Sequence, residues 1–153
     1  TVEGWFYINS IASTTGLAAI GDLFLLQINS TGTVLEVQYR NTPASAVWTI
    51  NDSTFTFATN TWYHIVGTYS YNTTTQMVTY LYVNTVATKV TPADQPLYGA
   101  NYTYLVCGRP PGINVGDTNY WNGYIGLWRV YNTALPQTQL TNNFNTLRWR
   151  YGV

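Results

Sequence analysis

The stretch that decides the fold covers residues 119–140 and reads N-Y-W-N-G-Y-I-G-L-W-R-V-Y-N-T-A-L-P-Q-T-Q-L. Residues 120–131 are rich in aromatic and β-branched side chains, which predicts one long strand. Alternation gives both faces apolar residues: Tyr124, Trp128 and Val130 on one, Ile125, Leu127 and Tyr131 on the other. Because a strand that is apolar on both faces is normally covered on both, we expect it in the middle of a sheet.

Two features of the same stretch predict local departures from a regular strand. Gly126 interrupts the apolar period and indicates a β-bulge or a close approach of another group to the backbone. After a turn, Pro136 stands where a short helix would begin, since its fixed φ suits the first helical position. Leu140 and Phe144 are four residues apart and would lay that helix on the sheet.

The rest of the chain consists of short apolar or alternating runs between turn residues, with almost no helical period. The expected strands are residues 2–8, 22–29, 34–40, 46–50, 54–57, 62–69, 76–83, 86–90 and 104–107. Residues 9–21, 91–102 and 108–119 are expected to be loops, and S-T-G-T (30–33) a hairpin turn. At Asn84 and Thr85 a two-residue turn would hold Thr at positive φ under strain, so a longer loop is the alternative. About ten short strands with frequent turns predict a two-sheet sandwich.

The composition describes one domain with an unusually uncharged surface. The chain has 153 residues, of which 8% are charged and 16% aromatic, with a formal net charge of zero. A typical soluble domain is roughly 25% charged, so little like-charge repulsion keeps copies of this protein apart. This favours a glycosylated, assembled or densely packed protein.

The charge pattern argues against two classes of partner. Phosphate binding needs a clustered basic face, and the only basic pair here is Arg148 and Arg150, so we expect no nucleic acid. The apolar segment 17–28 is interrupted by Asp22 and Gln27 and is too short to span a membrane, so we expect no membrane insertion.

Four motifs carry a resemblance to a known family. The stretch G-Y-I-G-L-W-R-V-Y-N-T-A-L-P (123–136) resembles the closing motif of laminin-G-like, concanavalin A-like domains. T-V-E-G-W-F-Y-I (1–8), T-W-Y-H-I-V-G-T-Y (61–69) and L-Y-V-N (81–84) resemble earlier motifs of that family in the same order. The resemblance spans nearly the whole chain and implies an all-β fold: a two-sheet antiparallel jelly-roll sandwich with one short helix near the C-terminus. This fold serves lectins, adhesion modules and glycanases alike.

The resemblance also raises a question about the domain boundary. Family members carry a segment before the first motif, including a strand that pairs with the C-terminal one. We therefore expect residues 1–153 to be a single laminin-G-like domain that lacks its N-terminal strand or is cut from a longer chain. If another segment supplies the missing strand, the open edge is an assembly site.

Catalysis is not expected from these residues. Glycanases of this fold carry an E-x-D-x-x-E strand, and hydrolysis needs two carboxyl groups roughly 5–10 Å apart. Here the only glutamates are Glu3 and Glu36, in no such pattern, so we predict that the protein is not an enzyme. His64 is the only histidine and aligns with a W-x-H position of the family, which favours a packed structural residue over a base or ligand. Cys107 is the only cysteine; a core thiol is preferred over an interchain bridge or reactive thiol.

Calcium is the one cofactor that the resemblance raises. Laminin-G relatives often bind it at the sandwich rim, and hard cations want several oxygen ligands. Where the family has an acidic residue this chain has Gly126. Asp94 and Asp117 lie in the two long loops and are the remaining candidates, with solvated turn formation as the favoured alternative. We expect no cofactor.

Glycan binding is the function that the aromatic residues favour. Sugar sites combine aromatic faces with amide and carboxylate hydrogen bonds. The candidates are Trp48, Tyr98, Tyr102, Asp117, Asn119, Tyr120 and Trp121. The same residues could instead be core aromatics or serve a protein–protein interface. Asn29, Asn51, Asn72 and Asn101 begin glycosylation sequons, about as many as this composition gives by chance.

Two functions are therefore expected. The first is a non-enzymatic recognition module that binds glycans or glycosylated partners at an extracellular or virion surface. The second is a structural assembly protein of a virion or fibre, which contacts other copies through aromatic surfaces and sheet edges. The tail N-F-N-T-L-R-W-R-Y-G-V (143–153) supports the second, because it resembles the ending of laminin-G-like domains in viral and phage fibre proteins.

Overall fold

The computed structural model describes residues 1–11, 14–20, 24–40, 47–52, 55–71, 77–90, 105–108 and 120–153. The elements in these ranges are β1 Val2–Ile8, β2 Thr15–Ile20, β3 Phe24–Ile28, β4 Leu35–Arg40, β5 Val47–Asp52, β6 Thr61–Tyr71, β7 Met77–Val83, β8 Val86–Val90, β9 Leu105–Cys107, β10 Gly123–Val130 and α1 Gln137–Tyr151.

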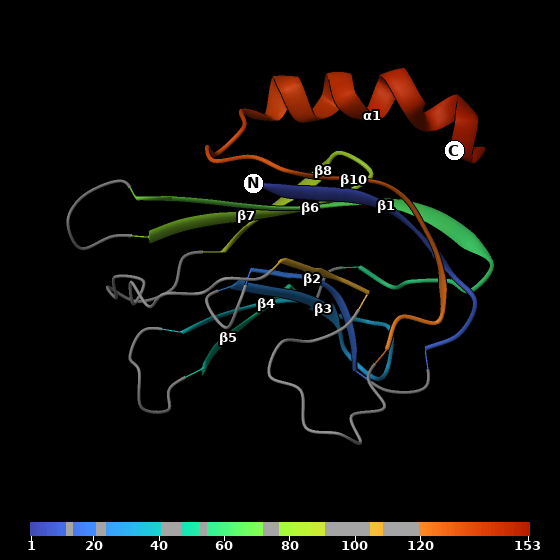
Figure 1. Ribbon diagram of the computed structural model, residues 1–153, viewed down its shortest axis with the longest axis horizontal. Helices are drawn as coiled ribbons and strands as arrows, with labels where there is room; N and C mark the ends of the chain where they lie inside the picture. The colour runs from blue at the N-terminus through green and yellow to red at the C-terminus, as the bar shows by residue number, and fades with distance from the viewer. Residues whose placement is uncertain are drawn as a thin grey trace.

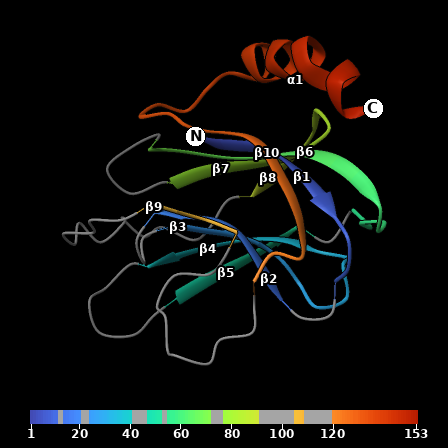
Figure 2. The same ribbon diagram turned by 45° about the vertical axis from the view of Figure 1, so that its right-hand side comes forward.

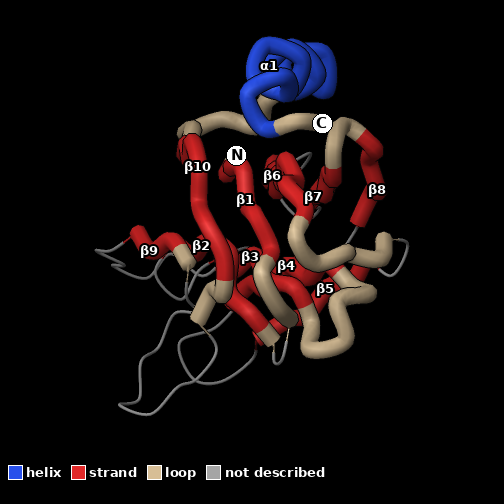
Figure 3. Tube along the Cα trace, turned by 90° about the vertical axis from the view of Figure 1, so that its right-hand side faces the viewer, coloured by secondary structure: helices blue, strands red, loops and turns tan. Residues whose placement is uncertain are grey.

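The strands form two antiparallel sheets packed face to face. One sheet has the order β10-β1-β6-β7-β8 and the other has the order β5-β4-β3-β2-β9. Helix α1 lies over the outer face of the first sheet, so the molecule has three layers (Figures 1 and 3). The predicted all-β sandwich with a C-terminal helix is confirmed.

The core explains why β1 is apolar on both faces. Val2, Phe6 and Ile8 point into the sandwich and are almost fully buried with residues of the opposite sheet such as Leu26 and Val37. Alternation turns the odd residues of β1 to the outer face. Glu3 and Trp5 are nevertheless buried there, because α1 packs on that face through Phe144.

β10 lies at the edge of its sheet, so its predicted central position is wrong. Its neighbour on one side is β1, and in the sheet order it has none on the other. Tyr124, Leu127 and Val130 remain exposed along it. The strand covered on both faces is β1, the next one in (Figure 2). The outer face of β10 is covered only in part, by Tyr151 of the last helical turn against Gly126.

The bulge predicted at Gly126 is confirmed by the register. Gly4 pairs with Trp128 and Phe6 pairs with Ile125, so two steps on β1 match three on β10. The extra residue falls at 126–127, and a Cβ on Gly126 would lie 2.5 Å from Tyr151 Oη. The bulge moves Ile125 onto the inner face with Trp128. The predicted division of the strand into faces is therefore wrong, because regular alternation ends at the bulge.

The helix begins one residue after Pro136, which was predicted as its first residue, and it is longer than expected. Pro136 is the N-cap residue, with φ −68° and ψ 152°, and Gly152 closes the helix at φ 72°. Leu140 and Phe144 are its buried residues, as predicted. The helix runs for 15 residues because its last residue, Tyr151, also finds an aromatic partner on the sheet.

Two other expectations about strands are wrong. Part of the expected loop 9–21 is β2, whose Leu17, Ala18 and Ala19 are fully buried. Glycine and alanine have weak strand preference, and burial between β3 and β9 overrides it. Residues 55–57 form no strand; Phe55 and Phe57 instead pack on Tyr63.

The hairpin turns at residues 84–85 and 29–34 are both short. Val83 pairs with Val86, so Asn84 and Thr85 form a two-residue turn at φ 48° and 77°, and the longer loop is excluded. Thr85 is therefore the strained β-branched residue that the sequence indicates. In the other turn Gly32 adopts φ 68°, and Asn29 Oδ1 accepts hydrogen bonds from the N–H groups of Thr33 and Val34.

Candidate functional site

The structure describes only some of the predicted binding residues. Tyr98, Tyr102, Asp117 and Asn119 lie outside the described residues, as do Asp94 and the sequon residues Asn72 and Asn101. Trp48 and Asn51 are placed by backbone alone, in β5, where they pair with Tyr39 and Glu36 of β4. Asn29 is half-buried in the first hairpin turn. The grouping of these side chains into one loop site therefore stays a prediction.

Tyr120 and Trp121 are described, and they differ in exposure. Trp121 is half-buried, with its ring edge-on to Phe6 at 5.5 Å. Its indole N–H donates to the carbonyl of Tyr124 at 3.3 Å, which anchors the start of β10. Tyr120 is 53% exposed beside it. Of this pair, Tyr120 is the side chain that a ligand can reach broadly.

A row of aromatic side chains crosses the outer face of the first sheet. Tyr7 is in register with Tyr124 of β10 and with Trp62 of β6. The ring centroids are 5.6 Å apart for Tyr7 and Tyr124 and 5.4 Å apart for Tyr7 and Trp62. Tyr151 of α1 continues the row 4.6 Å from Trp62. We call Tyr124, Tyr7, Trp62 and Tyr151 the aromatic row.

The aromatic row is accessible. Tyr124 is 63% exposed, and Tyr7, Trp62 and Tyr151 are half-buried. Aromatic faces and tyrosine hydroxyls together suit a ligand with apolar C–H faces and polar edges, such as a pyranose. Sequence reasoning missed Tyr7 and Trp62 because neither lies in a loop. The sequence does place an aromatic residue near one end of each of these strands. Only the strand pairing shows that these residues lie side by side.

A hollow lies at the other end of α1. It has a volume of about 290 Å³. Its lining comes from β6, β7 and the start of the helix: Thr68, Ser70, Tyr80, Tyr82, Ala134, Leu135, Pro136 and Gln137. That volume lies close to the lower end of the usual range for small-molecule sites, which is roughly 300–1,000 Å³.

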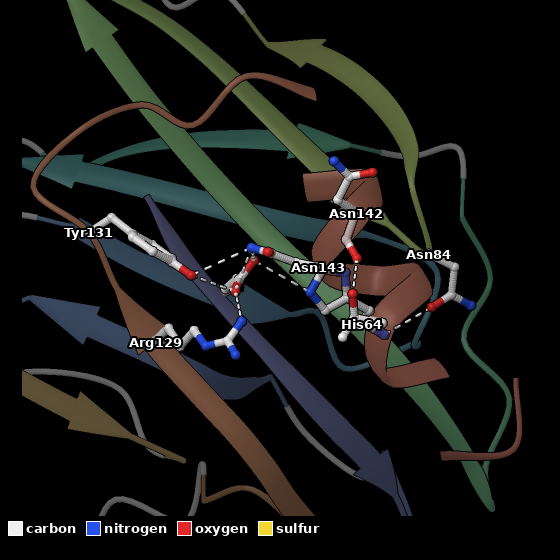
Figure 4. Close-up of polar contacts among 8 residues, drawn as sticks. His64, Asn84, Arg129, Tyr131, Asn142 and Asn143 are labelled. Atoms are coloured by element: carbon white, nitrogen blue, oxygen red, sulfur yellow. Dashed lines mark hydrogen bonds and ion pairs between the residues drawn. The ribbon is translucent and has the colours of Figure 1, made fainter. Parts of the chain in front are cut away.

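Between these two features the sheet and helix enclose a buried carboxylate. Glu3 accepts hydrogen bonds from Arg129 Nη1 and Tyr131 Oη at 2.9 Å and from Asn143 Nδ2 at 3.1 Å. His64 Nε2 lies 3.6 Å from the other carboxylate oxygen. Figure 4 shows His64, Arg129, Tyr131 and Asn143 converging from β6, β10, the following loop and α1. We call these five residues the Glu3 cluster.

The Glu3 cluster has a structural role, because it joins β1 to β6, β10, the following loop and α1. Burial would raise the pKa of Glu3, but the contacts from His64, Arg129, Asn143 and Tyr131 outweigh it and lower the pKa to about 2. The carboxylate is 3% exposed, so it is charged, paired and closed to a substrate. Sequence reasoning missed this cluster, since the partners of Glu3 are 61 to 140 residues away along the chain.

The predictions for His64 and Cys107 have different outcomes. His64 is buried, with its ring 5.0 Å from Trp5 and 5.9 Å from Phe144, so the packed structural histidine is confirmed. Cys107 is only half-buried, on β9, and packs against the core. Burial raises the pKa of its thiol to about 11, although a hydrogen bond from the Gly108 backbone opposes this, so the thiol is protonated at neutral pH.

Two further results concern only the described residues. They contain no group of three or more histidine, cysteine or acidic side chains that could hold a metal ion. Among their helices, none has the length and apolar character needed to cross a membrane.

The fold, the aromatic row and the closing motif define a lectin-type sandwich, and sequence comparison identifies the family. The model of the concanavalin A-like lectin/glucanases superfamily, of the laminin G type, matches residues 1–141, so the chain belongs to that superfamily. No curated protein matches the chain.

Two solved structures share the fold. One is a protein of Bacteroides ovatus ATCC 8483 that is thought to bind carbohydrate, with 20% identity, a TM-score of 0.62 and coverage of 92% of this chain and 39% of that one. The other is botulinum neurotoxin type C, whose cell entry depends on two ganglioside molecules, with 18% identity, a TM-score of 0.62 and coverage of 95% and 35%. The chain thus spans little more than a third of either protein.

Proposed function

We propose that this protein is a non-enzymatic recognition module that binds glycans or glycosylated partners at an extracellular or particle surface. The aromatic row is the observation that carries the proposal. It joins β10, β1, β6 and α1 into one accessible surface of neighbouring aromatic rings and hydroxyls. Membership of a superfamily that includes lectins supports it. So do the two structural neighbours, one thought to bind carbohydrate and one that interacts with gangliosides.

The polar groups around the row favour sugars over a purely apolar partner. Three of its four members are tyrosines, each with a hydroxyl that can donate and accept hydrogen bonds. Tyr120 stands just before the same strand and is also exposed. A pyranose presents C–H groups to a ring face and hydroxyls to the ring edge, so this mixture suits it.

A glycan array followed by calorimetric titration of the best ligand tests the proposal. Tyr124→Ala removes the most exposed ring of the row and is expected to weaken binding about tenfold, which corresponds to ~1.4 kcal/mol. Trp149→Ala is the matched control, because Trp149 is a 77% exposed aromatic on α1 outside the row. Equal affinity in Tyr124→Ala and wild type would remove the row from the binding site. Binding to no glycan on the array would overturn the function itself.

A second function, assembly with other copies in a virion or fibre, is favoured by the edge strand β10. Edge strands present unpaired backbone groups, and proteins usually protect them with lysine, proline or short length. β10 has eight residues and contains neither lysine nor proline. Its one charged residue, Arg129, is bonded to Glu3. By contrast, the opposite edge of the sheet, β8, has five residues and includes Lys89.

Light scattering over a concentration series tests assembly through β10. Under this hypothesis the wild-type protein forms oligomers, and Leu127→Lys dissociates them by placing a charge at the edge. Trp149→Lys adds the same charge on the helix and should leave the oligomers intact. A wild-type protein that stays monomeric at every concentration would contradict the hypothesis.

A further inference from the structure

We propose that the aromatic row binds a neutral, extended, unbranched oligosaccharide, with one sugar on each of its four aromatic side chains. This inference rests on the proposed function and deepens it, because it names the class of glycan that the row accepts. It commits to several consecutive sugars of one chain and not to a single terminal sugar. The row runs from Tyr124 on β10 through Tyr7 on β1 and Trp62 on β6 to Tyr151 on α1.

The first observation is the regular spacing of the rings. From Tyr124 to Tyr151, successive ring centroids lie 5.6, 5.4 and 4.6 Å apart. The first two distances follow from the sheet, because neighbouring strands lie about 4.8 Å apart and these residues are directly in register. The repeat of one sugar along an extended glycan is similar to this strand spacing. A glycan that lies across the strands therefore meets a new ring at each sugar.

The second observation is the tilt of each ring against the next. From Tyr124 to Tyr151, the successive interplanar angles are 47°, 59° and 54°. The rings therefore do not form one flat platform, and the flat surface of a packed polysaccharide crystal cannot lie on all of them. A single glycan chain can contact each ring, because rotation about every glycosidic bond lets successive sugars turn.

Contacts beneath the row hold its helical end in place. Tyr151 stacks on the buried side chain of Trp5, with ring centroids 4.3 Å apart and an interplanar angle of 15°. Its hydroxyl accepts a hydrogen bond from the N–H of Leu127 at 3.0 Å, and Gly126 leaves room for this approach. A tyrosine hydroxyl that accepts one hydrogen bond can still donate one to a sugar. Because the ring is already ordered, binding costs little side-chain entropy there.

The charges on the three strands favour a neutral glycan. In β1, β6 and β10 the only lysine, arginine or acidic residues are Glu3 and Arg129. These two residues are bonded to each other at 2.9 Å, and the Glu3 side chain is 3% exposed. A neutral glycan thus meets no unpaired charge along the strands, whereas a charged glycan would lose water without gaining a partner of opposite sign there.

Calorimetric titration of the full chain with oligosaccharides of increasing length tests the inference. The probes are β-1,4-linked oligomers of glucose, N-acetylglucosamine, mannose and xylose with one to six sugars, and α-1,4-linked glucose oligomers, which coil, are the matched control. We expect affinity for at least one β-linked series to rise about five- to tenfold per added sugar, up to four sugars, and then to stay level. Raising the ionic strength from about 0.1 M to about 1 M should leave Kd unchanged. Equal affinity for a monosaccharide and its tetrasaccharide would overturn the inference.

Variants locate the glycan on the row. Tyr124→Ala removes the exposed ring at one end, so the rise in affinity should stop at three sugars and the tetrasaccharide should bind about tenfold more weakly. Trp62→Phe keeps a ring in the middle of the row, so affinity should change only a few-fold while most of the glycan-induced change in tryptophan fluorescence is lost. Trp149→Ala is the control and should keep the rise up to four sugars. The same rise in Tyr124→Ala would overturn the inference.

The outcomes distinguish this inference from the proposed function. If glycans on the array bind while no β-linked series gains affinity with length, or while the α-linked series gains as much, the inference fails and the function stands. A fluorescence change that persists in Trp62→Phe would also overturn the inference, because the glycan would then lie away from the middle of the row. If neither the array nor the oligomers show binding, both fail.

Discussion

At the scale of single residues, Glu3 determines how the helix, the edge strand and the central strands are held together. It is a carboxylate withdrawn from water and compensated by four side chains from three elements and a loop. A buried charge is tolerated only when its partners are present, so each partner depends on the others. The Glu3 cluster therefore contributes to the stability of the fold.

Replacement of Glu3 by glutamine should destabilise the fold. Glu3→Gln leaves Arg129 without its counter-charge and replaces one carboxylate oxygen of the cluster by an amide, so we expect a loss of about 2–3 kcal/mol in the free energy of unfolding. Glu36→Gln is the control: Glu36 is less buried and accepts one hydrogen bond, from Gln27, so its loss should be below about 1 kcal/mol. Urea denaturation measures both. Equal effects in the two variants would show that the Glu3 cluster adds no special stability.

The same residue gives the protein a specific sensitivity to acid. The pKa of Glu3 is lowered from 4.5 to about 2 in the folded protein, so below pH 4.5 the unfolded chain takes up a proton that the folded one does not. The stabilisation from Glu3 is thus fully present above about pH 5 and is lost as the pH falls towards 2. Unfolding measured between pH 6 and pH 2 should show a smaller decrease in stability for Glu3→Gln than for wild type. Parallel curves would contradict this.

At the scale of elements, local sequence patterns predicted where elements begin and end better than they predicted which strands are neighbours in the sheet. The bounds of β1 and β8, the start of α1 and the bulge at Gly126 follow from residue preferences, because propensity and turn chemistry act over a few residues. The edge position of β10 could not be predicted, since a strand apolar on both faces has the same local pattern wherever it pairs. The effect of the bulge on the two faces needed the register with β1.

The turn between β7 and β8 offers a test at this scale. Thr85 adopts φ 77°, where its branched side chain is strained and glycine is not. Thr85→Gly should raise the free energy of unfolding by about 1 kcal/mol, and Thr85→Ala, which keeps a Cβ, should gain less. Thermal unfolding distinguishes the variants. If Thr85→Gly is no more stable than wild type, the turn is not strained.

The candidate binding surface was predictable only in part, for a related reason. Tyr120 was identified from its place in an aromatic segment, and it is exposed shortly before β10 in the chain. Tyr7 and Trp62 lie in strands that read as ordinary core strands. They join Tyr124 only because β1 pairs with β6 and β10 in one particular register. A surface assembled across strands is defined by long-range pairing, which one sequence does not reveal.

At the scale of the whole molecule, a composition with few charged residues fits a protein whose function is to contact a partner. The chain has 8% charged residues, and the described carboxylates Glu3 and Glu36 each accept hydrogen bonds from neighbouring side chains. Accessible aromatic and hydroxyl groups remain on the helix-bearing face, at both ends of α1. We therefore expect recognition to take place on that face of the sandwich.

The most direct test probes one glycan array with wild type, Tyr124→Ala and Trp149→Ala side by side. The account predicts that wild type and Trp149→Ala bind the same set of glycans, and that Tyr124→Ala loses most of that signal while its Tm is unchanged. It would be contradicted if Tyr124→Ala kept the wild-type pattern, or if the wild-type protein bound no glycan.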